Sequence, residues 1–265
     1  MNWHYHRMTI AYTGALMLFS SNIGKKTVEP AYYIHPFPAH KTVAPFTIYL
    51  TFDDGPSAGS EIVNELVEKE ALPVNVFLIG RNVCLTQRSR ELFRKYRSNP
   101  LVEIGNHSFT HAERRYEKYY RRPLSVLADI DRSRDSLQLE NGLVRLPGRN
   151  IFRVDSLSRD DHGNGSVAAD TLAANGYQIF GWDLEWRCHP GKGIGLHTGE
   201  EMMELVNSLL SRKKTFHQGR LIILLHDKEL LDENFRTELE TFISLVKKSD
   251  NCRFGHLSDY IRDDQ

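Results

Sequence analysis

The chain has 265 residues, and its 34 Lys and Arg residues balance its 34 Asp and Glu residues. This length suits one large α/β domain or two small ones. The balanced charge argues against a protein drawn to nucleic acid or acidic lipid by overall electrostatic attraction. The three cysteines, Cys84, Cys188 and Cys252, form no Cys-x-x-Cys pair, which argues against a cysteine-built metal site.

The first 45 residues divide into a signal-like stretch and a proline-containing segment without periodicity. Arg7 precedes a short apolar stretch, residues 8–19, which ends in small residues at Ser20 and Ser21. This layout predicts a secretory signal peptide over residues 1–21, and therefore export to the periplasm or the outside of the cell. A packed or disordered extension of a cytoplasmic protein is the alternative. The stretch is too short for a transmembrane span. The proline-containing residues 22–45 are predicted to be a linker or wrapping segment.

From residue 46 onward, strand-like patterns alternate with helix-like patterns. We expect strands at 46–52, 74–79, 101–105, 143–146, 177–180, 221–225 and near 253–254. We expect helices with apolar faces from Ile62 to Val67, from Pro123 to Leu137, after a capping box at Thr198 and Glu201, and from Leu239 to Val246. Such alternation predicts a parallel sheet. About seven units would close, or nearly close, into a barrel, and a doubly wound open sheet is the alternative.

Two adjacent aspartates, Asp53 and Asp54, end the first predicted strand and precede Gly55 and Pro56. Two carboxylates so close together repel each other unless a cation or a catalytic role holds them there. A solvated turn is the alternative, because Asp-Gly-Pro is favourable turn sequence.

Two histidines, His107 and His111, follow the third predicted strand. On a helical turn, side chains four residues apart point the same way, so their ring nitrogens can share one ion. With a carboxylate they would form a His-His-Asp site with open positions for water, as expected of a hydrolytic zinc-type metal.

Other polar residues follow the remaining strands. Arg145 ends the fourth, Asp183 and Glu185 follow the fifth, and His226 ends the sixth. Because parallel sheets bind ligands at the carboxyl ends of their strands, this convergence favours a functional site over a simple turn at Asp53.

These residues lie in five motifs, of which Thr-Phe-Asp-Asp-Gly-Pro (51–56) and Asn-His-Ser-Phe-Thr-His (106–111) are the most specific. Over about residues 46–227 the chain resembles the metal-dependent polysaccharide deacetylases, that is, the nodulation-protein-B homology domain or carbohydrate esterase family four. The resemblance implies an α/β catalytic domain over residues 46–262, folded as a distorted (β/α)7 barrel of parallel strands.

The resemblance also implies residue roles. Asp54, His107 and His111 would bind the metal, Asp53 would be the general base held by Arg145, and His226 would be the general acid tuned by Asp183. Leu224 and Trp186 would line the acetyl pocket. The backbone N–H of Gly148 is a candidate oxyanion donor. Two positions depart from the family pattern: Gly148 replaces the usual aromatic residue after Pro147, and Glu185 stands where aspartate is more usual.

The implied function is hydrolytic removal of N-acetyl groups from amino sugars in a polysaccharide or oligosaccharide of the peptidoglycan, chitin-like or poly-N-acetylglucosamine type. The cofactor would be one divalent ion, Zn²⁺ first and Co²⁺ or Ni²⁺ as replacements. The partner is an acetylated glycan, and nucleic acid is not expected although residues 113–122 are basic and rich in tyrosine. O-deacetylation of a glycan and non-catalytic glycan binding are the alternatives, and the oligomeric state stays open.

Overall fold

The computed structural model describes residues 46–188 and 197–262. The predicted signal peptide (1–21) and linker (22–45) lie outside the described residues. Among the helices that are described, none has the length and apolar character needed to span a membrane.

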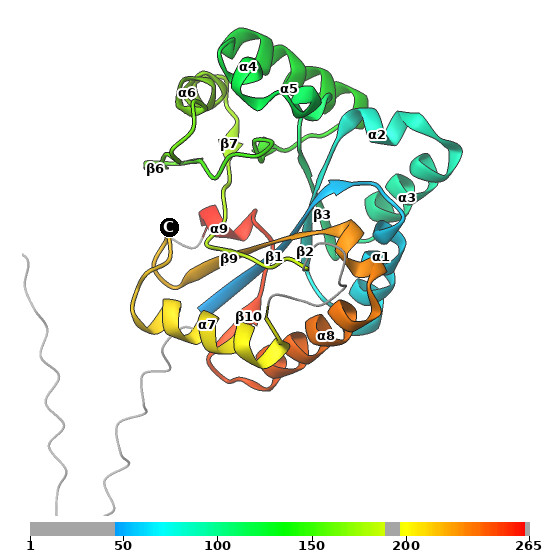
Figure 1. The fold of residues 1–265 in the computed structure, drawn as a ribbon, viewed down its shortest axis with the longest axis vertical. Coiled ribbons are helices and arrows are strands. Elements are labelled where there is room, and N and C mark those ends of the chain that lie inside the picture. The colour runs from blue at the N-terminus through cyan, green and yellow to red at the C-terminus, as the bar shows by residue number, and fades with distance from the viewer. Residues whose placement is uncertain (1–45, 189–196, 263–265) are drawn as a thin grey trace, which may run out of the picture. The chain divides into compact units, whose positions relative to one another are not determined.

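A ten-stranded sheet forms the centre of the domain (Figure 1). Eight of its strands pair in parallel: β1 Phe46–Gly55, β2 Val74–Leu78, β3 Val102–Asn106, β4 Leu143–Val144, β7 Gln178–Ile179, β8 Leu184–Glu185, β9 Arg220–His226 and β10 Cys252–Phe254. A short antiparallel hairpin, β5 Phe152–Val154 and β6 Leu157–Arg159, extends the β7 edge.

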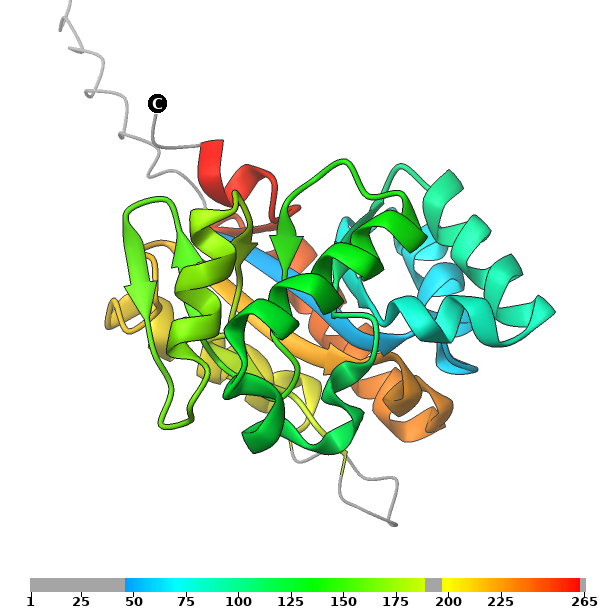
Figure 2. The same cartoon turned by 90° about the horizontal axis from the view of Figure 1, so that it is seen from above.

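The helices connect these strands. They are α1 Gly59–Glu70, α2 Gly80–Leu85, α3 Gln87–Ser98, α4 Tyr116–Tyr120, α5 Pro123–Leu137, α6 Ser166–Ala174, α7 Gly199–Ser211, α8 Glu233–Lys248 and α9 Asp259–Arg262. Two 3₁₀ turns, η1 His111–Arg114 and η2 Asp227–Leu231, follow β3 and β9. Figure 2 shows β1 and β9 running side by side, with helices on either side of them.

The predicted distorted barrel of parallel strands is confirmed. Seven strands lie in the order β7-β4-β3-β2-β1-β9-β8, and each pairs in parallel with its neighbour. Within the described ranges no ladder joins β8 to β7, so the barrel is open on that side.

Alternation along the strands separates an outer apolar layer from the barrel interior. Ile48, Leu50 and Phe52 of β1 belong to a cluster that includes apolar residues of α1, α7 and α8. Tyr49, the residue between two of them, belongs to an inner cluster with Ile222 and Phe77. Because side chains alternate across a strand, Thr51 and Asp53 share the inner face with Tyr49. The interior therefore changes from apolar to polar toward the carboxyl ends of the strands.

Local signals in the sequence account for several helix starts. Pro123 occupies the first turn of α5, where its missing N–H removes no intrahelical bond. Thr198 and Glu201 form the predicted capping box at the start of α7: the Glu201 N–H donates to Thr198 Oγ1, and the Thr198 N–H donates to Glu201 Oε2.

Candidate metal and active site

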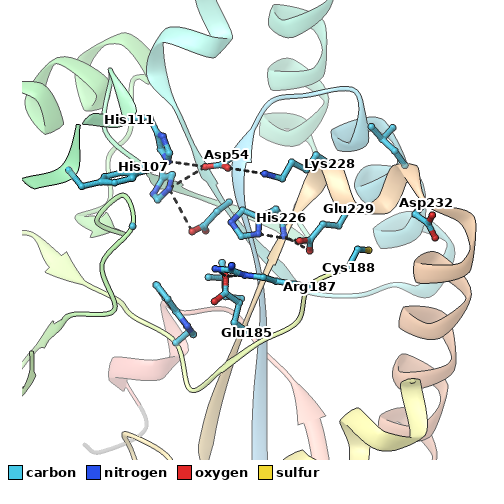
Figure 3. A pocket seen from close by; sticks show the side chains of 16 residues that line it. Asp54, His107, His111, Glu185, Arg187, Cys188, His226, Lys228, Glu229 and Asp232 are labelled. Carbon is cyan, nitrogen blue, oxygen red and sulfur yellow. Dashed lines mark hydrogen bonds and ion pairs between the residues drawn. The ribbon is translucent and has the colours of Figure 1, made fainter. Parts of the chain in front are cut away.

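The adjacent aspartates both face the inside of the barrel because β1 is irregular at this point. Consecutive strand residues normally point to opposite faces. The pairing of β1 with β2 shifts register between Asp53 and Gly55, and Asp54 adopts a left-handed backbone with φ 75°. Such a bulge re-aims a side chain. Asp54 therefore points toward His107 and His111 (Figure 3), while Asp53 Oδ2 lies 3.7 Å from His107 Nε2 and Asp53 pairs with His226 in the β1–β9 ladder.

Asp54, His107 and His111 form a cluster that could hold a metal ion. One ligand atom from each residue lies within 4.8 Å of the others. Asp54 Oδ1 is 3.1 Å from His111 Nε2 and 3.5 Å from His107 Nε2 (Figure 3). Two imidazoles and one carboxylate suit a zinc-type ion with open positions. These atoms fit the predicted ligand set.

The ring of His107 is fixed in the orientation that a metal ligand needs. Its Nδ1 lies 2.8 Å from the backbone carbonyl of Arg145, and because a carbonyl only accepts, Nδ1 carries the proton. Nε2 is then left with its lone pair and faces Asp54. A backbone carbonyl on the other ring nitrogen is a common support for metal-binding histidines.

The expected helical turn between the histidines is wrong. His107 directly follows β3, and His111 begins the η1 turn, in which residues 111 to 114 all have positive φ. A hydrogen bond from the His111 N–H to Ser108 Oγ holds this turn. The two rings converge, with centroids 5.0 Å apart, through a left-handed turn rather than through helical spacing.

The electrostatics of the cluster favour a bound cation. Burial alone would raise the pKa of Asp54, but the two histidine rings lower it far below its usual value. Burial alone would lower the pKa of His107, and the carboxylates of Asp53 and Asp54 instead raise it. Negative charge is thus concentrated where the three ligand atoms meet.

Asp53 borders this cluster, with Oδ2 3.7 Å from His107 Nε2, and its other carboxylate oxygen is held by Arg145. Both side chains are buried, and Arg145 Nη1 donates to Asp53 Oδ1 at 3.0 Å. The remaining guanidinium donors bond to Thr51 Oγ1 and to the carbonyls of Phe180 and Gly181. The guanidinium is therefore fixed on several sides, and it fixes the Asp53 carboxylate in turn.

His226 lies opposite Asp53 and has a carboxylate partner that the sequence did not indicate. Asp53 and His226 are register partners in the β1–β9 ladder. His226 Nδ1 lies 3.7 Å from Glu229 Oε1, and the His226 N–H donates to Glu229 Oε2 at 3.4 Å. Burial alone would lower the pKa of His226, but Glu229, Asp53 and Asp54 together raise it.

The expected partnership of Asp183 with His226 is wrong. The Asp183 carboxylate accepts hydrogen bonds from the N–H groups of Phe216 and Ile222. Ile222 precedes His226 by four residues on β9, which is about 13 Å along a strand. Asp183 therefore anchors the loop before β8 and stays outside the site.

The expected place of Trp186 in the acetyl pocket is also wrong. Trp186 is fully buried against Phe235 and Phe242 of α8, and its Nε1–H donates to the His197 carbonyl. Strand alternation explains this position: Glu185 pairs with Leu224 and faces inward, so the next residue faces the helices.

A cleft of about 890 Å³ joins these groups. It is lined by Asp53, Asp54, His107, His111, Leu224 and His226 of the predicted site, by Gly148, and by Tyr116, Trp182, Glu185, Arg187, Cys188, Lys228, Glu229, Leu231 and Asp232. Leu224, predicted to line the acetyl pocket, lines this cleft, and Trp182 is the tryptophan that borders it.

The Tyr116 ring lies against Gly148, the position after Pro147 where the family pattern has an aromatic residue. Gly148 adopts φ 63°, and a Cβ at this position would lie 3.2 Å from the Tyr116 ring. The same ring contacts His111 edge-on, with centroids 5.9 Å apart. Tyr116 comes from α4 and Gly148 from the loop after β4, so sequence spacing gave no signal for this pair. The close approach requires glycine at 148.

Residues 40–143 match the family model described as polysaccharide deacetylase. The Bacillus subtilis protein YheN, a polysaccharide deacetylase by name, is 26% identical over 144 residues, or 53% of this chain and 49% of YheN. The match therefore spans about half the length of that relative.

Solved structures share the fold at lower sequence identity. A carbohydrate esterase family four esterase from Streptococcus mutans superposes with a TM-score of 0.58 at 21% identity, covering 80% of this chain and 86% of that one. A family four carbohydrate esterase from Streptomyces lividans superposes with a TM-score of 0.56 at 17% identity, covering 82% of this chain and 96% of that one. The catalytic domain of a peptidoglycan N-acetylglucosamine deacetylase from Eubacterium rectale superposes with a TM-score of 0.54 at 17% identity, covering 80% of this chain and 89% of that one.

The matched residues 40–143 include Asp53, Asp54, His107 and His111, which the fold brings together at one end of the barrel. By this match over residues 40–143 and by this fold, the chain is similar to the polysaccharide deacetylases.

Proposed function

We propose that this chain is a metal-dependent hydrolase that removes N-acetyl groups from amino-sugar residues of a polysaccharide or oligosaccharide. The observation that carries this proposal is the division of work between adjacent carboxylates. Asp54 faces two histidine nitrogens, whereas Asp53 is held by Arg145 and lies opposite His226 on β9. A metal ligand, a separate base and an acid are the groups that amide hydrolysis needs.

Asp54, His107 and His111 would hold the ion, which when bound supplies Lewis-acid chemistry that polarises the acetyl carbonyl and activates water. Asp53 accepts a proton from the attacking water, and Arg145 keeps its carboxylate oriented. The Gly148 N–H makes no hydrogen bond within the described ranges and borders the cleft, so it is available to a developing oxyanion.

His226 donates a proton to the departing amine nitrogen. Its raised pKa keeps the ring protonated at a higher pH than an ordinary histidine, as a general acid requires. Leu224 offers an apolar contact for the acetyl methyl group beside Glu185. The cleft admits a sugar residue with its neighbours, so a glycan of the peptidoglycan, chitin-like or poly-N-acetylglucosamine type is the substrate class that we propose.

Release of acetate from a panel of acetylated glycans, with and without chelator, tests this function. We expect acetate from N-acetylated oligosaccharides and loss of release when the ion is removed. Release from O-acetylated glycans alone would favour the O-deacetylase alternative. Glycan binding without acetate release from any member of the panel, in protein shown to contain metal, would make the chain a binding protein.

The metal site predicts about one divalent ion per chain, with zinc as the ion that we propose and cobalt or nickel as replacements. His107→Ala or His111→Ala should weaken metal binding at least about tenfold, because each removes one ligand. Metal analysis after dialysis against a competing chelator measures this. His162→Ala, which removes an exposed histidine outside the cluster, is the control and should keep its ion. Full occupancy in the double-histidine variant would refute the site.

Glu229 is proposed as the positioning partner of His226. Glu229→Gln removes the charge that raises the pKa of His226, so the high-pH limb of the rate profile should move to lower pH. At pH 8 the rate on an acetamide substrate should fall by about three- to tenfold, and activated esters, whose leaving groups need no proton, should change less.

Glu229→Asp should restore part of the shift because it keeps the carboxylate. Asp232→Asn removes another carboxylate that lines the same cleft and should leave the pH profile in place. An unchanged profile in Glu229→Gln would exclude this role for Glu229.

A further inference from the structure

A second hollow adjoins the metal cluster on the side of α2 and η1. It measures about 750 Å³ and shares Asp54, His111, Tyr116 and Lys228 with the main cleft. Its remaining lining residues are Ser57, Ile79, Arg81, Asn82, Thr110, Glu113, Arg114 and Asp227. A glycan with its acetyl group at the ion would therefore extend into this hollow as well as into the cleft beside His226.

The accessible charge of this hollow is positive. Arg81 and Arg114 are exposed, and within the described residues neither forms an ion pair. Lys228 is also exposed, and its Nζ lies 3.9 Å from Asp54 Oδ2 (Figure 3).

The acidic residues in the same hollow are already engaged. Glu113 forms an ion pair with Arg115, which is not among the residues lining this hollow. Asp227 is buried and accepts hydrogen bonds from the Ser60 hydroxyl and the Ser57 N–H. Asp54 belongs to the metal cluster. Among the residues lining this hollow, none therefore offers Arg81 or Arg114 a free carboxylate.

The main cleft differs in charge, although it adjoins the hollow. Glu185, Glu229 and Asp232 line it, and the Arg187 guanidinium pairs with Glu185. An anionic group on a bound glycan would meet carboxylates in that cleft and unpaired guanidinium groups in the hollow. Arginine binds carboxylate, phosphate and sulfate oxygens with paired N–H donors.

We propose that the hollow lined by Arg81, Arg114 and Lys228 is a subsite for an anionic substituent, so that the preferred glycan carries an acidic group next to the N-acetylated residue. This inference rests on the proposed function, because it assumes that the glycan binds with its acetyl group at the metal cluster. The anionic group is a carboxylate or a phosphate or sulfate ester, since all three present oxygen pairs to guanidinium.

Binding of matched oligosaccharides tests the subsite. The probes are chitotetraose with its C6 positions oxidised to carboxylates, the methyl ester of the same oligomer, and 6-O-sulfated chitotetraose. The protein is the zinc-loaded full chain carrying Asp53→Asn, so that acetyl groups are not consumed. At 50 mM NaCl we expect the anionic probes to bind about 5- to 20-fold more tightly than the ester. This ratio corresponds to the combined binding free energy of two exposed ion pairs. The preference should shrink at 500 mM NaCl.

R81Q/R114Q should abolish this preference without changing affinity for the ester. R94Q/R121Q is the matched control, because it removes the same charge from exposed arginines outside the hollow and should keep the preference. Melting temperature and metal content verify that each variant is folded and loaded. A preference that survives R81Q/R114Q would mean that the anion binds the metal ion or Lys228 rather than the two arginines, and a preference lost equally in the control would mean general surface attraction. Either result, or equal affinity for acid and ester, overturns the proposal.

Acetate release separates this proposal from the proposed function. If wild-type protein releases acetate from acidic and neutral oligomers at equal kcat/KM, the hydrolase stands and the subsite falls. If no probe releases acetate but binding depends on Arg81 and Arg114, the subsite stands and the hydrolase falls.

Discussion

Asp53→Asn is expected to lower the rate of acetate release by about two to four orders of magnitude while the metal stays bound, the range typical of losing a general base. Asparagine has the same shape but cannot accept the proton from water. The metal should remain because Asp54, His107 and His111, rather than Asp53, bring their ligand atoms together. Substrate affinity should change little, since the cleft lining is preserved.

Asp54→Asn is expected to fail in a different way. It replaces the only carboxylate in the described ligand cluster, so the ion should be lost on dialysis and activity should return in part when excess ion is added. Metal analysis alongside single-turnover rates distinguishes the two variants. Loss of metal from Asp53→Asn with retention in Asp54→Asn would exchange the two roles. Full activity in both variants would refute the hydrolytic reading of the site.

The strand pattern of the sequence predicted the site residues that lie at the carboxyl ends of strands. Asp53, Arg145 and His226 each end or follow a strand whose apolar pattern is visible in the sequence, and the parallel sheet brings these ends together. Alternation also predicts that they share one face. This part of the site therefore follows from side-chain alternation within each strand and from the parallel pairing of neighbouring strands.

The parts that sequence reasoning missed depend on register and on turns. The resemblance implies that Asp183 tunes His226, but the pairing of Leu184 with Ile223 sets Asp183 level with the middle of β9. Glu229 reaches His226 through a 3₁₀ turn, whose i,i+3 geometry brings these side chains together. Neither the register nor the turn is fixed by local composition.

Fold prediction failed where elements bury little apolar surface. Helix α3, over Gln87–Ser98, buries only Leu92 and Tyr96, so its apolar stripe is too thin to be recognised. The hairpin formed by β5 and β6 has strands of three residues each, and β6 is largely exposed. The buried strands β1, β2 and β9, by contrast, are mostly apolar, and each was predicted within a few residues of its bounds.

Arg145→Met is expected to lower the free energy of unfolding by about 3–5 kcal/mol, the cost typical of removing one partner of a buried ion pair. Arg145 is fully buried and donates to Thr51, Asp53, Phe180 and Gly181. Methionine fills a similar length but donates nothing, so the Asp53 carboxylate and two carbonyls would be left without these bonds. Denaturant unfolding of metal-free protein measures the change without the contribution of bound ion.

The double variant Arg145→Met/Asp53→Asn separates the ion pair from the rest of the arginine's contacts. If the cost of Arg145→Met lies mainly in the unpaired Asp53 carboxylate, removing that charge should make the double variant more stable than the sum of the two single losses predicts. Arg145→Lys keeps the charge but cannot reach four acceptors with one ammonium group, so it should lose part of the stability and most of the order that Arg145 imposes on Asp53. Strict additivity in the double variant would show that the carbonyl and hydroxyl contacts, rather than Asp53, account for the burial of Arg145. The role of Arg145 would then be to hold β4 and the loop after β7 together, with the orientation of the base as a consequence.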